Sequence, residues 1–152
     1  MHVALCRSVS HNGAMDYKSN RNVVFSCNYH VVFCPKYRRK VLVGNVESRL
    51  KAIVDEVALE TETDILEMEV MADHVHLLVG VDPQFGVHRF VKRVKGRSAR
   101  DLRADFKSLR TRLPTLWTNS YFVSTVGGAP LAAVGQYIES QKRSEPRKKR
   151  NA

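Results

Sequence analysis

The sequence lacks the features that mark secreted, membrane-spanning or disulfide-stabilised proteins. It has three cysteines, Cys6, Cys27 and Cys34, and none has the CxxC or Cys/His spacing of a zinc knuckle. No run of about 18 apolar residues is present to span a bilayer, and the N-terminus lacks the charged-then-apolar layout of a signal peptide. We therefore expect free thiols, a cytoplasmic location and no membrane association.

Acidic residues are few compared with basic ones. The chain has 15 Asp and Glu against 25 Lys and Arg, a formal net charge of +10. This excess favours a polyanionic partner, because each neutralised phosphate releases condensed counterions. A membrane surface is the competing polyanion, but no polybasic amphipathic helix stands beside an apolar anchor. The charge therefore points to nucleic acid.

The two ends of the chain differ from its middle. Residues 1–22 mix polar and apolar residues without a period, which predicts a disordered lead or a start codon placed too early, with Met15 as the alternative start. Residues 143–152 form a basic, proline-containing tail that is either solvated or grips phosphates. One domain is expected between them, over residues 23–142.

The middle of the chain alternates between two hydrophobic periods. Runs rich in β-branched and aromatic residues predict strands over residues 23–33, 65–72, 74–81 and 121–126, the middle two joined as a hairpin. Apolar residues spaced by three and four predict helices over 46–58, 87–103 and 130–141. The order βαββαβ predicts an α+β fold, a ferredoxin-like or RRM-like antiparallel sheet, with an additional C-terminal helix.

Two histidines form the first candidate site. His74 and His76 are two residues apart on an expected strand, so their side chains project from the same face while Val75 points the other way. Two imidazoles on one face can bind one metal ion. From spacing alone, a pair of polar residues on a solvated face remains an equal alternative.

The last expected helix carries the second candidate. Tyr137 and Gln141 are four residues apart, hence about 40° apart around the helix axis and one turn along it. Taken alone, this pattern is also typical of a partly buried tyrosine whose hydroxyl reaches water.

Two basic segments are candidates for DNA contacts. The loop Lys36, Tyr37, Arg38 and Arg39 combines cations with an aromatic ring that can stack on a base. On the second helix, Arg93, Arg97 and Arg100 are spaced to share a face, with Gly96 and Ser98 allowing close approach to a backbone. The alternative for this helix is a solvated charged face.

The combination of these features resembles the single-tyrosine HUH transposases of small bacterial insertion sequences, the family called IS-two-hundred/six-hundred-five. The likeness runs from about Met15 to Lys142. It includes the His-hydrophobic-His strand, the late Tyr-Ile-Glu-Ser-Gln helix and the stretches YHVVFCPKYRR (29–39), MEVMADHVHLLV (68–79), VKGRSAR (94–100) and YFVSTVGG (121–128). The family usually has a proline where this chain has Ala72, a difference that leaves every candidate ligand in place.

The resemblance implies a role for each candidate residue. Tyr137 would be the nucleophile that forms a 5′-phosphotyrosine link with single-stranded DNA, and His74, His76 and Gln141 would hold a divalent metal. Mg²⁺ or Mn²⁺ is expected from the family, although two histidine ligands also suit Zn²⁺ or Co²⁺. Glu139 lies about 200° around the helix from Tyr137, so no dedicated base for the phenol is evident.

The resemblance also implies the partners. The substrate would be single-stranded DNA with hairpin ends, and a homodimer would share its active sites, with Gly127, Gly128 and Ala129 as a hinge before the last helix. The alternatives are a non-catalytic RRM-like module, a nuclease without a covalent step, and a related HUH endonuclease acting on host repeats. The RRM-like alternative is weakened because this sequence contains no RNP-like motif.

Overall fold

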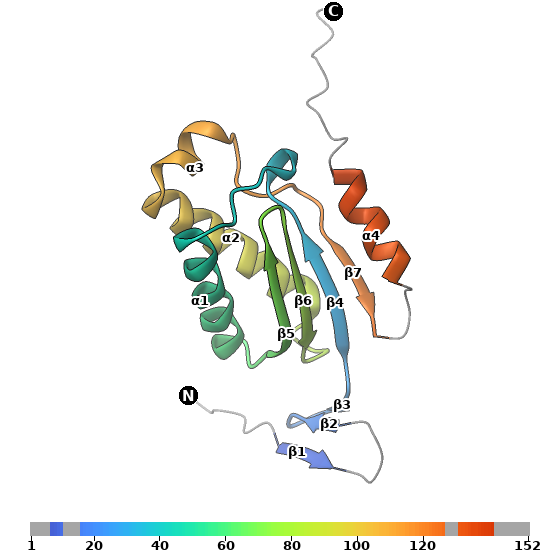
Figure 1. Cartoon of the computed structure of the whole chain (residues 1–152). Coiled ribbons are helices and arrows are strands. Elements are labelled where there is room, and N and C mark those ends of the chain that lie inside the picture. Colours follow the sequence, from blue (N-terminus) through green and yellow to red (C-terminus); the bar gives the residue numbers. More distant parts are fainter. Residues whose placement is uncertain (1–6, 11–15, 127–130, 142–152) are drawn as a thin grey trace, which may run out of the picture.

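The computed structural model describes residues 7–10, 16–126 and 131–141, and it contains two antiparallel sheets (Figure 1). The larger sheet has the strand order β5-β6-β4-β7. Its strands are β4 (Asn28–Phe33), β5 (Asp64–Met71), β6 (His74–Gly80) and β7 (Phe122–Thr125). With the helices α1 (Asn45–Glu60) and α2 (Val87–Asp105), they give the βαββαβ order and confirm the expected α+β fold.

The helices α1 and α2 lie on one face of this sheet and bury its apolar residues. Strand residues Val31 and Leu77 are paired across β4 and β6, and both are fully buried. The apolar stripe of α1 packs here through Leu50, Ile53 and Val54, and α2 adds Phe90 and other residues. Burial of apolar surface on this face is the main force holding the domain together.

The β5–β6 hairpin places the two histidines. Met71 and His74 are paired across it, so Ala72 and Asp73 form a two-residue turn, as the sequence predicts. Along β6, Val75, Leu77 and Val79 face the helices and are buried, whereas His74 and His76 lie on the opposite face and are half-buried. The alternation of a strand therefore explains why both imidazoles lie outside the core.

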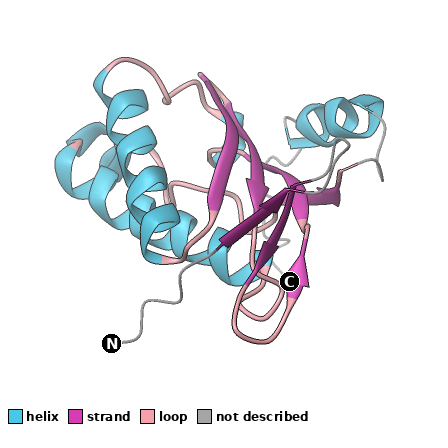
Figure 2. Cartoon of the chain, turned by 90° about the horizontal axis from the view of Figure 1, so that it is seen from below, coloured by secondary structure: helices cyan, strands magenta, loops and turns pink. Residues whose placement is uncertain are grey.

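The last helix, α4 (Leu131–Ser140), lies on the side of the sheet opposite α1 and α2 (Figure 2). Figure 1 shows it beside β7, at the edge of the sheet. The histidine face of the sheet is therefore partly covered by the helix that carries Tyr137. Among the described helices, none combines the length and the apolar character needed to cross a bilayer.

Two expectations about local structure need correction, and one short helix was not expected. The expected strand 23–33 is divided into β3 (Val24–Phe25) and β4, because β3 pairs with β2 (Asp16–Ser19) in the smaller sheet. Within the lead 1–22, β2 also pairs with β1 (Arg7–Ser10), so these two segments are strands and not disordered. A short helix, α3 (Lys107–Arg112), follows α2 and buries Leu109. The tail 143–152 lies outside the described residues.

Candidate active site on the histidine face of the sheet

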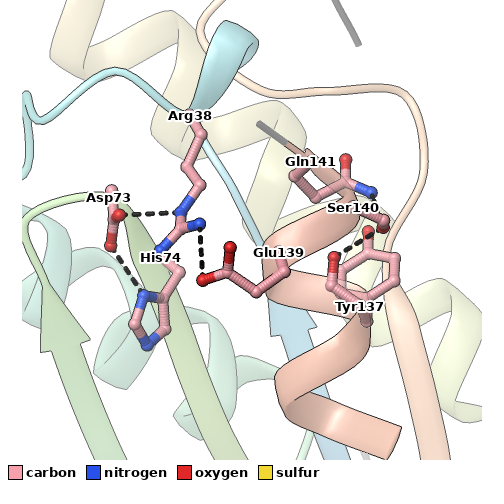
Figure 3. A network of polar contacts seen from close by, with 7 residues as sticks. All are labelled: Arg38, Asp73, His74, Tyr137, Glu139, Ser140 and Gln141. Atoms are coloured by element: carbon pink, nitrogen blue, oxygen red, sulfur yellow. Dashed lines mark hydrogen bonds and ion pairs between the residues drawn. The ribbon is translucent and has the colours of Figure 1, made fainter. Parts of the chain in front are cut away.

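His74 is oriented by Asp73, which is itself held by Arg38. The Nδ1 atom of His74 lies 2.8 Å from Oδ1 of Asp73, and Oδ2 of Asp73 lies 2.7 Å from Nε of Arg38 (Figure 3). A carboxylate can only accept, so Nδ1 of His74 carries a proton, and in the neutral ring the lone pair lies on Nε2. The ring is thus held in the tautomer that a metal ligand needs.

The Asp73 carboxyl is stabilised in its charged form. Burial by itself would raise its pKa, but the hydrogen bond from His74 and the positive charge of Arg38 together hold the pKa below its usual value. The side chains of Arg38 and Asp73 are only 10% and 13% exposed, so this ion pair is shielded from water. It fixes the turn that carries His74.

His76 has a partner that the sequence did not single out, His30 on β4. Nδ1 of His30 lies 3.1 Å from Nε2 of His76, and the ring centres are 5.3 Å apart with an angle of 18° between the planes. The distance between the ring centres exceeds the distance between the two nitrogens by about 2.2 Å, which is about the sum of the two ring radii. The two nitrogens therefore lie between the ring centres. The rings therefore meet edge to edge and share one hydrogen bond, in which one donates and the other accepts.

The environment of His76 favours its neutral form. Burial lowers its pKa, His30 lowers it further, and the carboxylates of Glu69 and Glu67 only partly oppose this. A neutral imidazole is the form that binds a metal ion. Because His30 belongs to another strand, only the register of β4 against β6 brings it to His76, and nothing in the local sequence pattern shows this.

Tyr137 contacts the end of the segment that leads into β7. Its hydroxyl lies 3.2 Å from Oγ of Ser120, and its ring centre is 5.6 Å from that of Phe122. Burial raises the pKa of the Tyr137 phenol, and the hydrogen bond with Ser120 opposes only part of the change. In this position the hydroxyl stays protonated at neutral pH.

The side of α4 that faces His74 carries Glu139 and not the tyrosine. Oε1 of Glu139 lies 3.3 Å from Nη1 of Arg38, whereas Tyr137 and Gln141 lie on the other side of the helix (Figure 3). Nε2 of Gln141 is 3.3 Å from Oγ of Ser140. Successive residues turn by about 100°, so Glu139 and Tyr137 cannot face one site together. Within a single chain, the two histidines are brought together, but Tyr137 and Gln141 are not brought to them.

The basic loop after β4 divides into an inward and an outward part. It forms a short 3-10 helix, Lys36–Arg38, in which the Nζ atom of Lys36 lies 5.4 Å from the centre of the Tyr37 ring. Tyr37 packs partly against the core, and Arg38 is paired with Asp73 and Glu139. Arg39 is exposed. Arg38 therefore contacts the turn that carries His74, and the expectation that it contacts DNA stays a prediction.

The candidates on α2 also differ in their placement. Arg97 donates two hydrogen bonds to the Glu60 carboxylate, at 2.8 and 2.6 Å, and the Arg93 guanidinium lies 5.6 Å from the Phe85 ring. The Arg100 side chain is 77% exposed. Ser98, however, is fully buried and accepts a hydrogen bond from the Trp117 indole at 2.9 Å. The expectation that Ser98 contacts DNA is wrong because its hydroxyl faces the core.

The donor groups on the histidine face fit a divalent metal ion. The described residues contain no group of three or more His, Cys, Asp and Glu side chains that could hold a metal. His74 and His76 nevertheless present two imidazoles on one face: the Asp73 contact leaves Nε2 of His74 available as a ligand, whereas Nε2 of His76 meets Nδ1 of His30 in this structure. A further oxygen ligand would have to come from elsewhere, and the expected Gln141 lies on the far side of α4 (Figure 3).

Comparison with known proteins gives consistent relatives. The family model described as "Transposase IS200 like" matches residues 23–141. The chain is 40% identical over 129 residues to the ISDra2 transposase TnpA of Deinococcus radiodurans, covering 84% of this chain and 92% of that protein. It is 34% identical over 128 residues to the transposase for insertion sequence element IS200 of Salmonella typhimurium, covering 83% and 84%.

Two solved structures are similar as well. A crystal structure of a transposase from Deinococcus radiodurans superposes with a TM-score of 0.75 at 40% identity, covering 82% of this chain and 97% of that one. A REP-associated tyrosine transposase bound to a REP hairpin superposes with a TM-score of 0.52 at 12% identity, covering 83% and 74%. The second likeness concerns the fold alone.

Proposed function

The chain belongs to the IS200-like transposase family, and from this premise we propose that it cleaves and rejoins single-stranded DNA at insertion-sequence ends through Tyr137. The observation that carries this proposal is the pair of imidazoles on the sheet face that α1 and α2 leave open, His74 oriented by Asp73 and His76 paired with His30. A site of this kind suits phosphoryl transfer, in which positioning and charge stabilisation do most of the work.

Each residue has a defined part in the proposed reaction. The Tyr137 hydroxyl oxygen attacks the scissile phosphorus and loses its proton to solvent, while the bond from phosphorus to the 3′ oxygen breaks and releases a 3′-OH. Attack by a 3′-OH on the phosphotyrosine reverses the step and joins a new strand. His74 and His76 would hold Mg²⁺ or Mn²⁺, with Gln141 as a further ligand. When bound, this ion would offset the negative charge that develops on the phosphate.

The position of α4 supports a shared active site. In one chain, Tyr137 is protonated against Ser120 and lies on the side of α4 away from His74 (Figure 3). We infer that the α4 helix of one subunit completes the histidine site of the other in a homodimer. Residues 127–130, which include Gly127 and Gly128, connect β7 to α4 and lie outside the described residues, so the expected hinge there stays a prediction.

The RRM-like alternative is less consistent with this surface. An RRM stacks bases on aromatic side chains of its open sheet face. Here that face carries His30, His74 and His76, and α4 covers part of it (Figure 2). The observed side chains therefore favour metal binding over base stacking.

The decisive experiment is a search for a covalent adduct. The protein is incubated with Mg²⁺ and either single-stranded or duplex oligonucleotides of the element ends, and the products are separated under denaturing conditions. We expect an adduct with single strands only, absent from Tyr137→Phe and present in the control Tyr17→Phe, whose ring is exposed on β2. An adduct that persists in Tyr137→Phe would exclude Tyr137 as the nucleophile.

Mixing two inactive variants tests the shared site. If α4 acts on the partner, co-expressed Tyr137→Phe and His76→Ala chains form dimers in which one site has intact histidines and an intact tyrosine. We expect adduct formation to return in this mixture. If each chain used its own tyrosine, neither site would be complete and the mixture would stay inactive.

A further inference from the structure

Ser124 of β7 carries a buried hydroxyl on the same face of the sheet as the histidines. Side chains alternate along β7, so Ser124 lies on the face of Phe122, whose ring packs against Tyr137. Its Oγ atom is buried, and no described residue forms a hydrogen bond with it. A buried hydroxyl without a partner costs free energy, because it has given up its hydrogen bonds to water. Such a group calls for a functional explanation.

His30 of β4 lies between this hydroxyl and His76. It is paired directly with Ser124 across β4 and β7, and with Leu78 across β4 and β6. The Cβ atoms of directly opposite residues are about 4.5–5.5 Å apart, so the His30 imidazole can reach the Ser124 hydroxyl by turning about its side-chain bonds. In the structure its Nδ1 instead lies 3.1 Å from Nε2 of His76. One imidazole therefore has two polar partners within reach and contacts one of them.

The contact with His30 occupies the nitrogen of His76 through which an ion would bind. The other ring nitrogen of His76, Nδ1, faces the Glu69 carboxylate at 3.8 Å. A carboxylate on one ring nitrogen leaves the second nitrogen for the ion, as Asp73 does for His74. Nε2 of His76 is thus the ligand nitrogen, and it cannot hold an ion and the hydrogen bond with His30 together. This holds whichever of the two nitrogens carries the proton.

We propose that His30 is a positioning residue with two partners: it pairs with His76 until a divalent ion binds Nε2 of that ring, and it then turns to the Ser124 hydroxyl. The proposal rests on the proposed function, because it takes His76 as a ligand of the ion. The hydrogen bond with Ser124 replaces the one that ion binding breaks, so no imidazole is left unpaired on the sheet face. The Ser124 hydroxyl thereby favours the ion-bound form.

Ser124→Ala should affect stability and metal affinity differently. In EDTA the hydroxyl has no hydrogen bond to lose, so its removal should leave the midpoint of urea unfolding unchanged or raise it. Binding of Mn²⁺ to the full-length protein, measured by calorimetric titration, should weaken about three- to tenfold, which corresponds to the loss of one neutral hydrogen bond. The control Ser108→Ala makes the same change at an exposed position of α3 and should alter neither quantity.

A double-mutant cycle shows whether the effect passes through His30. Phenylalanine suits a strand and has no ring nitrogen, so His30→Phe removes the contact with His76 and the one with Ser124 together. Its Mn²⁺ affinity should stay within about threefold of the parent value, because one hydrogen bond is lost before ion binding and one after it. Adding Ser124→Ala to His30→Phe should then change the Mn²⁺ affinity no further.

Three results would overturn the inference while leaving the proposed function intact. The first is an equal Mn²⁺ affinity of Ser124→Ala and the parent protein. The second is an equal effect of Ser124→Ala with and without His30→Phe. The third is a loss of about 100-fold or more in His30→Phe, which would make His30 a ligand of the ion. A parent protein that binds no Mn²⁺ and forms no adduct at Tyr137 would instead contradict the proposed function, and the inference with it.

Discussion

The ion pair between Arg38 and Asp73 links the stability of the fold to the geometry of the proposed metal site. Replacing Asp73 by Asn keeps the shape of the side chain but removes the charge that Arg38 faces at 2.7 Å and His74 at 2.8 Å. Both side chains of the ion pair are nearly buried, so the guanidinium would be left with a poorer partner. Loss of one partner in a buried pair costs about 3–5 kcal/mol. Glu139 still contacts Arg38, so we expect a loss of about 2–3 kcal/mol.

The same substitution should weaken metal binding. Asn at position 73 no longer fixes the Nδ1 proton of His74, and loss of such an orienting partner typically reduces metal affinity about 10- to 100-fold. Urea unfolding followed by circular dichroism measures the stability, and calorimetric titration with Mn²⁺ measures the affinity. Asp105→Asn is the control, because that carboxylate pairs with Arg49 at an exposed position and should contribute about 0.2–1 kcal/mol.

The dependence on pH provides an internal check. The pKa of Asp73 is lowered in the folded protein, so its stabilising contribution is complete above the unfolded value of about 3.9 and is lost as the pH falls through the lower folded value. The stability difference between the parent protein and Asp73→Asn should therefore be constant near neutral pH and shrink in acid. Equal stability and equal Mn²⁺ affinity of the two proteins at neutral pH would refute this reasoning.

Three other predictions concern the core, a thiol and the metal. Ser98→Ala removes the buried hydrogen-bond partner of the Trp117 indole and should lower the free energy of unfolding, measured in urea, by about 1–2 kcal/mol. The salt dependence of DNA binding should stay unchanged. A smaller slope of log affinity against log salt would show that Ser98 contacts DNA. Burial raises the pKa of the Cys34 thiol to about 11, so the peptide containing Cys34 should stay unalkylated by iodoacetamide at pH 8 in the folded protein and react on unfolding, as read by mass spectrometry. EDTA should abolish adduct formation without lowering Tm by more than a few degrees, because the core needs no metal; unfolding by EDTA would show a structural ion instead.

Periodicity was sufficient to predict most of the fold. The period-two run over β6 and the helical spacing over α1 and α2 set which residues face the core, and hydrophobic burial enforces that choice. The weaker predictions concern pairing between segments. The strands β1, β2 and β3 depend on one another for their hydrogen bonds, and no local pattern in residues 7–25 indicates that they meet.

The chemistry of the site shows the same division. The spacing of His74 and His76 determines that they share a face, because side chains alternate along any strand, and the spacing of Tyr137 and Gln141 determines that they share a helix turn. The partners of these side chains were decided only by tertiary structure. His30 contacts His76 because of the register between β4 and β6. The Ser98 hydroxyl faces the core, where it accepts a hydrogen bond from the indole of Trp117, 19 residues away.

The orientation of α4 could not be predicted from the sequence either. Helical spacing determines that Glu139 and Tyr137 point in different directions, but it does not say which of them faces the histidines. Packing of the Tyr137 ring on Phe122 and the contact of Glu139 with Arg38 settle that choice within one chain. The sequence by itself thus determined which residues lie on each face of each element. Only the tertiary structure decided which faces meet, because those contacts depend on residues far apart in the chain.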